Sequence, residues 1–302
     1  MIKAYIFSLA AILVSLELSG QTFFNNKYNR RYVVSAGSGI SSYYGDLNSP
    51  KDKLDFGVNL FGGLQYMVSP QFGVRLEFGY FRLAGQDSGS RHQVHVERNL
   101  SFRSNNLELA LHGVYNIMPG GSRFYQRQVV NPFVTGGVGI LKFNPRAEYQ
   151  GKTYALRRLQ TEGDKYGQFT PVIIIGGGAR IMINPFINGV IEIGYRKSFT
   201  DYLDDVSTVH VDKATFLDPV AVALSDRAAE AGYPPREAGT IRGNSDRKDA
   251  YLLINAKIEY YLPYTFLNKP GSNGGKRKIG SPKPGKRKRP PGGKRPGRLF
   301  NR

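Results

Sequence analysis

The chain has 302 residues, with 42 Lys and Arg against 23 Asp and Glu and a formal net charge of +19 at pH 7. It contains no Cys, which excludes a disulfide framework and an N-terminal lipid-modified Cys. The excess charge is concentrated at the end of the chain: residues 264–302 hold 13 Lys and Arg and no acid, which leaves 29 basic against 23 acidic residues elsewhere.

Residues 1–20 have the composition of a secretory signal peptide. Lys3 gives a positively charged start, the apolar run 4–16 follows, and the small residue Gly20 ends the segment. The run is shorter than the roughly 20 apolar residues that a membrane-spanning helix needs. We therefore expect export, cleavage near Gly20 and a periplasmic lead-in over residues 21–30. An exported protein does not meet the chromosome, so nucleic acid is not expected as a partner despite the positive charge.

Alternating polarity indicates strands along the middle of the chain. In the segment FGVRLEFGY, Leu76 and Phe78 fall on one face of an extended chain, whereas Glu77 falls on the other. The same period of two recurs in other segments. Eight strands are expected, near residues 31–46, 54–69, 72–85, 100–117, 131–145, 170–183, 186–199 and 249–263.

The connections and the polar face favour an outer-membrane β-barrel, with a soluble sandwich or lipocalin-like barrel as the alternative fold. Connections after the second, fourth and sixth strands are short or moderate, whereas those after the third, fifth and seventh are long. This asymmetry is typical of transmembrane barrels whose short turns face the periplasm, and an even strand count then places both termini there. Charges of both signs on the polar face are expected to neutralise one another inside a filled barrel. These interior residues are Arg75, Glu77, Glu108, Arg180, Glu192, Arg196, Lys257 and Glu259.

The longest expected loop spans residues 200–249. Within it, the segment DPVAVALSDRAAEAG predicts one short helix, with Asp218 as the N-cap, Pro219 at the first helical position and Gly232 beyond the end.

Two groups of side chains have the chemistry of a reactive or metal site. His112 and Glu108 lie four residues apart on the polar face of one strand, but no nucleophile is identified beside them, and they serve equally well as interior filling. His92, His95 and Glu97 in the segment HQVHVE could share one side of an extended chain, yet a further firm metal ligand is lacking. We expect neither an enzyme nor a bound metal or cofactor.

Two segments carry a resemblance to a known family. SSYYGDLN closes the first expected strand, and SFTDYLDDVST opens the long loop. Their motif residues are Tyr43, Tyr44, Gly45, Asp46, Asp201, Tyr202, Asp204 and Asp205. Together with the following LDPVAVALSDR, they resemble the PorG-like family of outer-membrane β-barrels linked to the type IX secretion system and gliding motility.

This resemblance covers about residues 31–263. It implies a non-enzymatic barrel that anchors a periplasmic ring of PorK- and PorN-type proteins to the outer membrane, and it implies no catalytic task for the motif residues. For the Asp residues, capping of backbone N–H groups is favoured over holding a cation.

Residues 264–302 are expected to form a disordered basic tail in the periplasm, because Gly, Pro, Lys and Arg dominate them and leave too little apolar surface to fold. A flexible coil of this length spans about 35 Å. Its candidate partners are acidic surfaces of the periplasmic ring, anionic cell-wall polymer or lipid head groups, bound by charge. A tail that is only solvated is the alternative. The candidate partner-binding residues are Lys276, Arg277, Lys278, Lys286, Arg287, Lys288, Arg289, Lys294 and Arg295.

The sequence therefore predicts an all-β protein, an eight-stranded antiparallel transmembrane barrel over residues 31–263 followed by a basic tail. The leading functional hypothesis is a structural component of type IX protein secretion in the cell outer membrane. A general adhesin or surface-recognition barrel and a lipid-modifying enzyme are the alternatives.

Overall fold

The computed structural model describes residues 30–47, 57–90, 92–121 and 124–263. The predicted signal peptide (1–20), nearly all of the predicted lead-in (21–30) and the predicted tail (264–302) lie outside the described residues.

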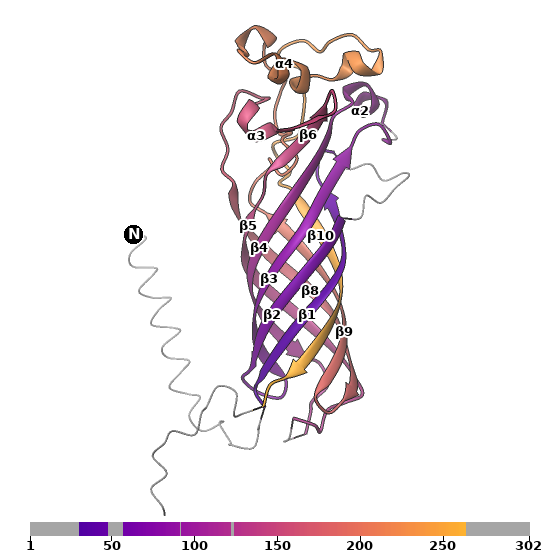
Figure 1. Cartoon of the computed structure of the whole chain (residues 1–302), viewed down its shortest axis with the longest axis vertical. Coiled ribbons are helices and arrows are strands. Elements are labelled where there is room, and N and C mark those ends of the chain that lie inside the picture. Colours follow the sequence, from indigo (N-terminus) through magenta and orange to yellow (C-terminus); the bar gives the residue numbers. More distant parts are fainter. Residues whose placement is uncertain (1–29, 48–56, 91, 122–123, 264–302) are drawn as a thin grey trace, which may run out of the picture.

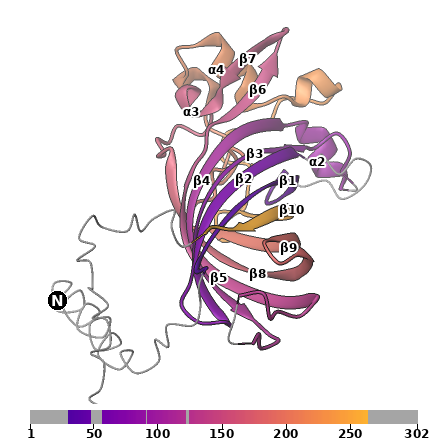
Figure 2. The ribbon, with the colours of Figure 1, turned by 60° about the horizontal axis from the view of Figure 1, so that its bottom comes forward.

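Eight antiparallel strands form a closed barrel, as the sequence predicts (Figures 1 and 2). The sheet runs in the order β3-β2-β1-β10-β9-β8-β5-β4, and the pairing of β3 with β4 closes it. The barrel strands are β1 (Tyr32–Tyr44), β2 (Gly57–Met67), β3 (Phe72–Gln86), β4 (Ser101–Asn116), β5 (Val130–Lys142), β8 (Phe169–Asn184), β9 (Ile187–Ser198) and β10 (Ala250–Tyr261).

The two faces of each strand explain why the barrel belongs in lipid. On β3, the outward Leu76 and Phe78 are 49% and 53% exposed, whereas the inward Arg75 and Glu77 are 1% and 2% exposed. In water this arrangement would leave an apolar band uncovered and would bury charge. A soluble β-sandwich or lipocalin-like barrel is therefore the wrong interpretation, because the apolar side faces outward around the barrel.

The two ends of the barrel differ. The connections 68–71 and 185–186 are short and lie at the same end as Arg30 and Pro263, the first and last described residues of the barrel region (Figure 1). The long connections lie at the opposite end, where they build a folded cap above the strands (Figure 1). The predicted asymmetry is confirmed for these connections, while the third connection at the terminal end, 117–129, is of moderate length as predicted.

The cap contains short elements from three connections. They are α2 (Gln93–Arg98), the hairpin of β6 (Pro145–Tyr149) and β7 (Lys152–Ala155), α3 (Leu156–Leu159), the 3-10 helix η1 (Lys213–Thr215), α4 (Pro219–Ser225) and the 3-10 helix η2 (Ala228–Ala231). The β6–β7 hairpin continues the edge of β4, since Arg103 of β4 pairs with Arg146 of β6. None of the helices in the described part of the chain has the length and apolar character to cross a membrane.

Two local predictions for the cap are corrected. The segment HQVHVE is helical rather than extended, and the left-handed Asn99 (φ 55°) ends that helix. The single helix predicted from Asp218 to Gly232 begins as expected, with the Asp218 side chain accepting from Val220 N at 2.8 Å, but it breaks at Asp226.

The break at Asp226 has a clear cause. Its backbone is extended (φ −147°), and its carboxylate accepts from Ala228 N at 3.1 Å, Arg236 N at 2.8 Å and Lys213 Nζ at 2.7 Å. A short acidic side chain that binds nearby backbone donors competes with continued helix, so a separate 3-10 turn follows.

Candidate functional site

The barrel interior holds a charge-balanced set of buried side chains. Four are basic and four are acidic, and none is more than 6% exposed. They are Arg75, Arg180, Arg196, Lys257, Glu77, Glu108, Glu192 and Glu259. All eight were predicted from the alternation, and the structure confirms that they neutralise one another.

The centre of this network joins three strands across the interior. Arg75 on β3 donates two hydrogen bonds to Glu192 on β9, from Nη1 to Oε2 at 2.8 Å and from Nη2 to Oε1 at 2.6 Å. Lys257 Nζ on β10 lies 2.5 Å from Glu77 Oε2 and 3.3 Å from Glu192 Oε2. Bidentate and charge-assisted contacts of this kind are the strong ones, and here they tie opposite walls together.

Two further ion pairs fill the interior on either side of the centre. Toward the cap, Glu108 accepts from Tyr251 Oη at 2.5 Å, and its Oε1 lies 3.4 Å from Arg196 Nε. Toward the termini, Arg180 Nε lies 2.9 Å from Glu259 Oε2. An eight-stranded barrel has room for side chains and little more, so these pairs leave a filled interior rather than a pore.

The candidate pair of His112 and Glu108 does not form a reactive centre. Glu108 is bound to Arg196 and Tyr251 instead, and His112 is fully buried, with Nδ1 3.3 Å from Thr135 Oγ1 and Nε2 3.9 Å from Glu77 Oε1. Buried in the filled interior, His112 lacks the access to substrate that a lipid-modifying site would require.

The two motif segments, far apart in the sequence, meet at the cap end of the barrel. Tyr43 Oη donates to Asp249 Oδ1 at 2.5 Å, and Leu47 N donates to Asp204 Oδ2 at 3.2 Å. Asp249 Oδ2 also accepts from Leu203 N at 2.9 Å. The end of β1 therefore holds both the start and the end of the long loop.

The first motif has little tolerance for substitution. A Cβ at Gly45 would lie 1.9 Å from Tyr43 Oη and 2.1 Å from Asp249 Oδ1, so only glycine fits beside this hydrogen bond. Asp46 accepts from Asn244 N at 2.6 Å, which fixes the far end of the loop. Tyr44 is exposed on the outer surface of the barrel.

The second motif caps backbone groups and packs aromatic rings. Asp204 Oδ1 accepts from Val206 N at 3.0 Å, and the Asp205 carboxylate accepts from Thr161 Oγ1 at 2.5 Å and from the Tyr166 hydroxyl. The Tyr202 ring stacks on Tyr166 with centroids 4.6 Å apart. The predicted capping role is confirmed for Asp204, and no group of residues in the described ranges is suited to hold a metal ion.

Two residues that hold the long loop 200–249 in place, Arg242 and Glu162, were not identified from the sequence. Arg242 Nη1 donates to Glu162 Oε1 at 2.7 Å and to the Asp205 carbonyl at 2.6 Å, and both Arg242 and Glu162 are nearly fully buried. Glu162 also accepts from Ser207 N at 2.9 Å and Thr208 N at 3.0 Å. The pair is 80 positions apart along the chain, so no local pattern announces it.

Several carboxyl groups in the cap have raised pKa values. Burial, the largest cause, raises the pKa of Asp249 to about 8, that of Asp201 to about 7 and that of Asp205 to about 6. Neighbouring acids add to the effect, since Asp249 and Asp201 each face other carboxylates. Within the described residues, neither carboxyl oxygen of Asp201 has a hydrogen-bond partner.

The tail residues predicted to bind a partner, from Lys276 to Arg295, lie outside the described residues. Their role stays a prediction.

Comparison with known proteins adds a family and a set of similar folds. The sequence matches the family described as outer membrane protein beta-barrel domain over residues 7–214. No match was found among curated proteins. The crystal structure of Neisserial surface protein A is similar at 7% sequence identity and a TM-score of 0.41, with 76% of this chain and 97% of that chain covered. The outer membrane protein OprG from Pseudomonas aeruginosa is similar at 11% identity and a TM-score of 0.38, with 78% and 99% covered.

Proposed function

The chain belongs to the outer membrane protein beta-barrel domain family, and within this family we propose that it is a non-enzymatic structural barrel of the type IX protein secretion machinery. In this role it anchors a periplasmic ring of PorK- and PorN-type proteins to the outer membrane.

The observation that carries this proposal is the meeting of the two motifs that resemble the PorG-like family. Tyr43 and Leu47 of the first motif segment bind Asp249 and Asp204 respectively, so the motif residues form one connected unit at the cap. Such contacts give the motifs a structural task, which fits a family without a catalytic site. The filled interior supports the same view, because it favours an anchor over a conducting pore.

The orientation supports a partner on the terminal side. In transmembrane barrels the short turns face the periplasm and the long loops face outward, which supports a periplasmic position for Arg30 and Pro263. We propose that the basic residues 264–302, which lie outside the described residues, start from this side; a flexible coil of their length spans about 35 Å. Acidic surfaces of the ring proteins are the proposed contact, with anionic cell-wall polymer and lipid head groups as further anionic candidates.

Deletion of the gene tests the function directly. Cargo proteins of the secretion system are expected to remain inside the cell, and a plasmid copy of the wild-type gene should restore their release. Normal secretion by the deletion strain contradicts the proposal.

A second experiment tests the tail. A chain that ends at Pro263 is expected to insert and to keep its heat-modifiable mobility on a gel, but to lose salt-sensitive capture of periplasmic proteins. A matched full-length variant with the nine basic candidates from Lys276 to Arg295 changed to Gln separates charge from length. Capture by this variant equal to wild type would show that the positive charges are passive.

A surface-recognition barrel is the second candidate, and a feature of the cap favours it. Leu217 and Ile241 are 102% and 83% exposed, on a folded cap that lies outside the lipid band. A partner that covered these side chains would remove their apolar surface from water. Pull-down separates the two candidates, because a surface-recognition barrel should recover no periplasmic ring proteins.

A further inference from the structure

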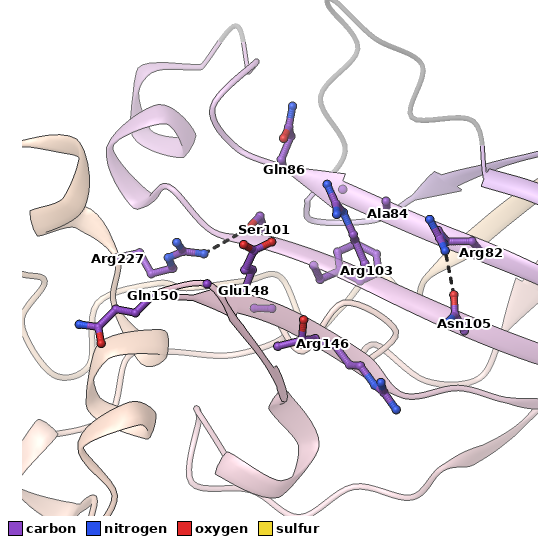
Figure 3. A pocket seen from close by; sticks show the side chains of 15 residues that line it. Arg82, Ala84, Gln86, Ser101, Arg103, Asn105, Arg146, Glu148, Gln150 and Arg227 are labelled. Atoms are coloured by element: carbon purple, nitrogen blue, oxygen red, sulfur yellow. Dashed lines mark hydrogen bonds between the residues drawn. The ribbon is translucent and has the colours of Figure 1, made fainter.

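An arginine-lined groove lies on the outer surface of the barrel, where β3 and β4 leave the apolar band and the β6–β7 hairpin rises beside them (Figure 3). Its volume is about 480 Å³. We propose that this groove binds the phosphate groups of a phosphorylated glycolipid in the membrane leaflet on the cap side.

The groove concentrates positive charge without neutralising it. Arg82, Arg103, Arg146 and Arg227 line it, and Glu148 is the single acid among its lining residues. Arg227 is already engaged, since its Nη2 lies 2.7 Å from Glu230 Oε2. Arg103 and Arg146 are exposed, and neither makes an ion pair or a hydrogen bond to any described residue.

The strand register makes this arrangement costly in the absence of an anion. Arg103 on β4 and Arg146 on β6 are directly opposed cross-strand partners. Like charges at such positions repel each other and destabilise the pairing. Arg82 lies close by, because its neighbour Ala84 pairs with Arg103 in the β3–β4 ladder. An anion bound between Arg103 and Arg146 removes the repulsion and accepts hydrogen bonds from both, whereas Arg82 already donates from Nε to Asn105 Oδ1 at 3.3 Å and has its remaining N–H groups to offer (Figure 3).

The height of the groove matches the lipid head groups. The outward face of β3 runs through Leu76, Phe78 and Tyr80 and then reaches Arg82. Leu107, which pairs with Tyr80, is the corresponding last apolar residue on β4. Arg82 lies two residues beyond this boundary, about 7 Å along the strand and about 5 Å along the membrane normal after the usual tilt. The head-group layer extends about 5–7 Å beyond the hydrocarbon core on each side.

The chemistry selects phosphate and the position selects a lipid. Planar guanidinium groups bind the oxygens of phosphate in pairs, which a single ammonium group does not do. The groove opens directly above the outward Tyr80 and Leu107, so a lipid whose phosphate occupies it can lay its acyl chains on the apolar band below. A soluble phosphate compound gains nothing from that band.

Native mass spectrometry of the full-length protein from detergent tests the proposal, with bisphosphorylated lipid A as the probe. The variant R82Q/R103Q/R146Q is compared with R158Q/K165Q/R247Q, which removes the same charge from exposed positions of the cap outside the groove. We expect the groove variant to bind lipid A at least about tenfold more weakly, since several charge-assisted hydrogen bonds are lost, and the control to stay within about twofold of wild type. Heat-modifiable gel mobility verifies that both variants are folded.

Two measurements on the wild-type protein make the test independent of the variants. Lipid A from which both phosphates have been removed should bind at least about tenfold more weakly than intact lipid A. Inorganic phosphate at the same concentration should fail to displace the lipid. Equal binding of both lipids, equal weakening in both variants, or displacement by free phosphate would each overturn the assignment of a lipid phosphate site.

Discussion

Replacing Glu192 by Gln is expected to weaken the barrel strongly, because it removes one charge from a balanced interior. Glu192 accepts two hydrogen bonds from Arg75, at 2.6 and 2.8 Å, and lies 3.3 Å from Lys257. Gln fills nearly the same volume, so packing is kept. The change leaves four buried positive charges against three negative ones, and Arg75 and Lys257 must then share Glu77.

The size of the effect follows from the contacts. Two hydrogen bonds between charged partners contribute about 1.5–3 kcal/mol each, and the Gln carbonyl retains one bond from the charged Arg75 guanidinium, at the lower end of that range. The expected loss in free energy of unfolding is therefore about 3 kcal/mol, at the lower end of the range of about 3–5 kcal/mol for breaking a buried ion pair. Removing the positive charge of Lys257 as well restores the charge balance of the interior. The double variant E192Q/K257M is therefore expected to recover at least about half of the lost free energy of unfolding, because replacing both members of a buried ion pair is often neutral or stabilising.

Urea unfolding of the folded protein in phosphatidylcholine vesicles measures these free energies, followed by heat-modifiable mobility on a gel. The matched control is E237Q, which removes the charge of an exposed glutamate in the cap, outside the arginine-lined groove, and should change stability by no more than about 0.5 kcal/mol. A value for E192Q indistinguishable from that for E237Q would refute the reasoning. So would a double variant no more stable than E192Q.

Three further outcomes are expected. The pKa values of Asp249 (about 8) and Asp201 (about 7) are raised, so these carboxyl groups bind protons more tightly in the folded cap than in the unfolded loop. Their contribution to the stability of the cap is therefore complete below about pH 4 and is lost as the pH rises through about 8. Hydrogen exchange in residues 200–249, corrected for intrinsic rates, should be slower at acid than at alkaline pH, and D249N should flatten the difference. R242Q should open the long loop to protease while the barrel keeps its heat-modifiable mobility, whereas the exposed R247Q should leave cleavage unchanged. Wild-type protein in a planar bilayer should show no steady single-channel current, and a resolved channel would contradict the filled interior.

The strands were predictable because the lipid on one side and the polar interior on the other each select a different type of residue. Each strand faces lipid on one side and an ionic interior on the other, so apolar and polar residues alternate without interruption through the membrane. All eight expected strands are present, and the largest boundary error within the described residues is small: 145 against Lys142 for β5. Residues 54–56 of the second expected strand lie outside the described residues. The same alternation identified the interior charges.

The pairing of those charges was not predictable. Arg75 meets Glu192, which is 117 positions away, because barrel closure and strand stagger bring β3 and β9 to face each other. A period of two assigns each residue to a face but gives no register around the barrel. The partner of each charge is therefore fixed by closure of the barrel.

The cap escaped sequence reasoning for a different reason. Above the membrane the strands of the hairpin are short: β6 alternates between buried and exposed residues over only five positions, and the four residues of β7 do not alternate, so both segments were assigned to a loop. The segment around Val96 is helical instead of extended because buried Arg98 binds Asp87 at 2.7 Å and holds the helix end in place. The resemblance to a known family identified the motif residues. Their contacts with Asp249 could not be predicted, because Asp249 is brought beside them only when the long loop 200–249 folds back to the barrel.

A filled interior also limits how the two ends of the molecule can influence each other. Arg75, Lys257 and their acidic partners lie between the cap and the termini, and all are held by charge-assisted contacts in a closed sheet. Changes at sites this far apart, without a shared partner, usually have additive effects. R242Q, which loosens the cap, should therefore leave the proposed capture of periplasmic partners by residues 264–302 unchanged, and combining it with truncation after Pro263 should add the two defects without synergy. A cap variant that altered capture on the periplasmic side would require a movable element through the interior, which this network of ion pairs does not provide.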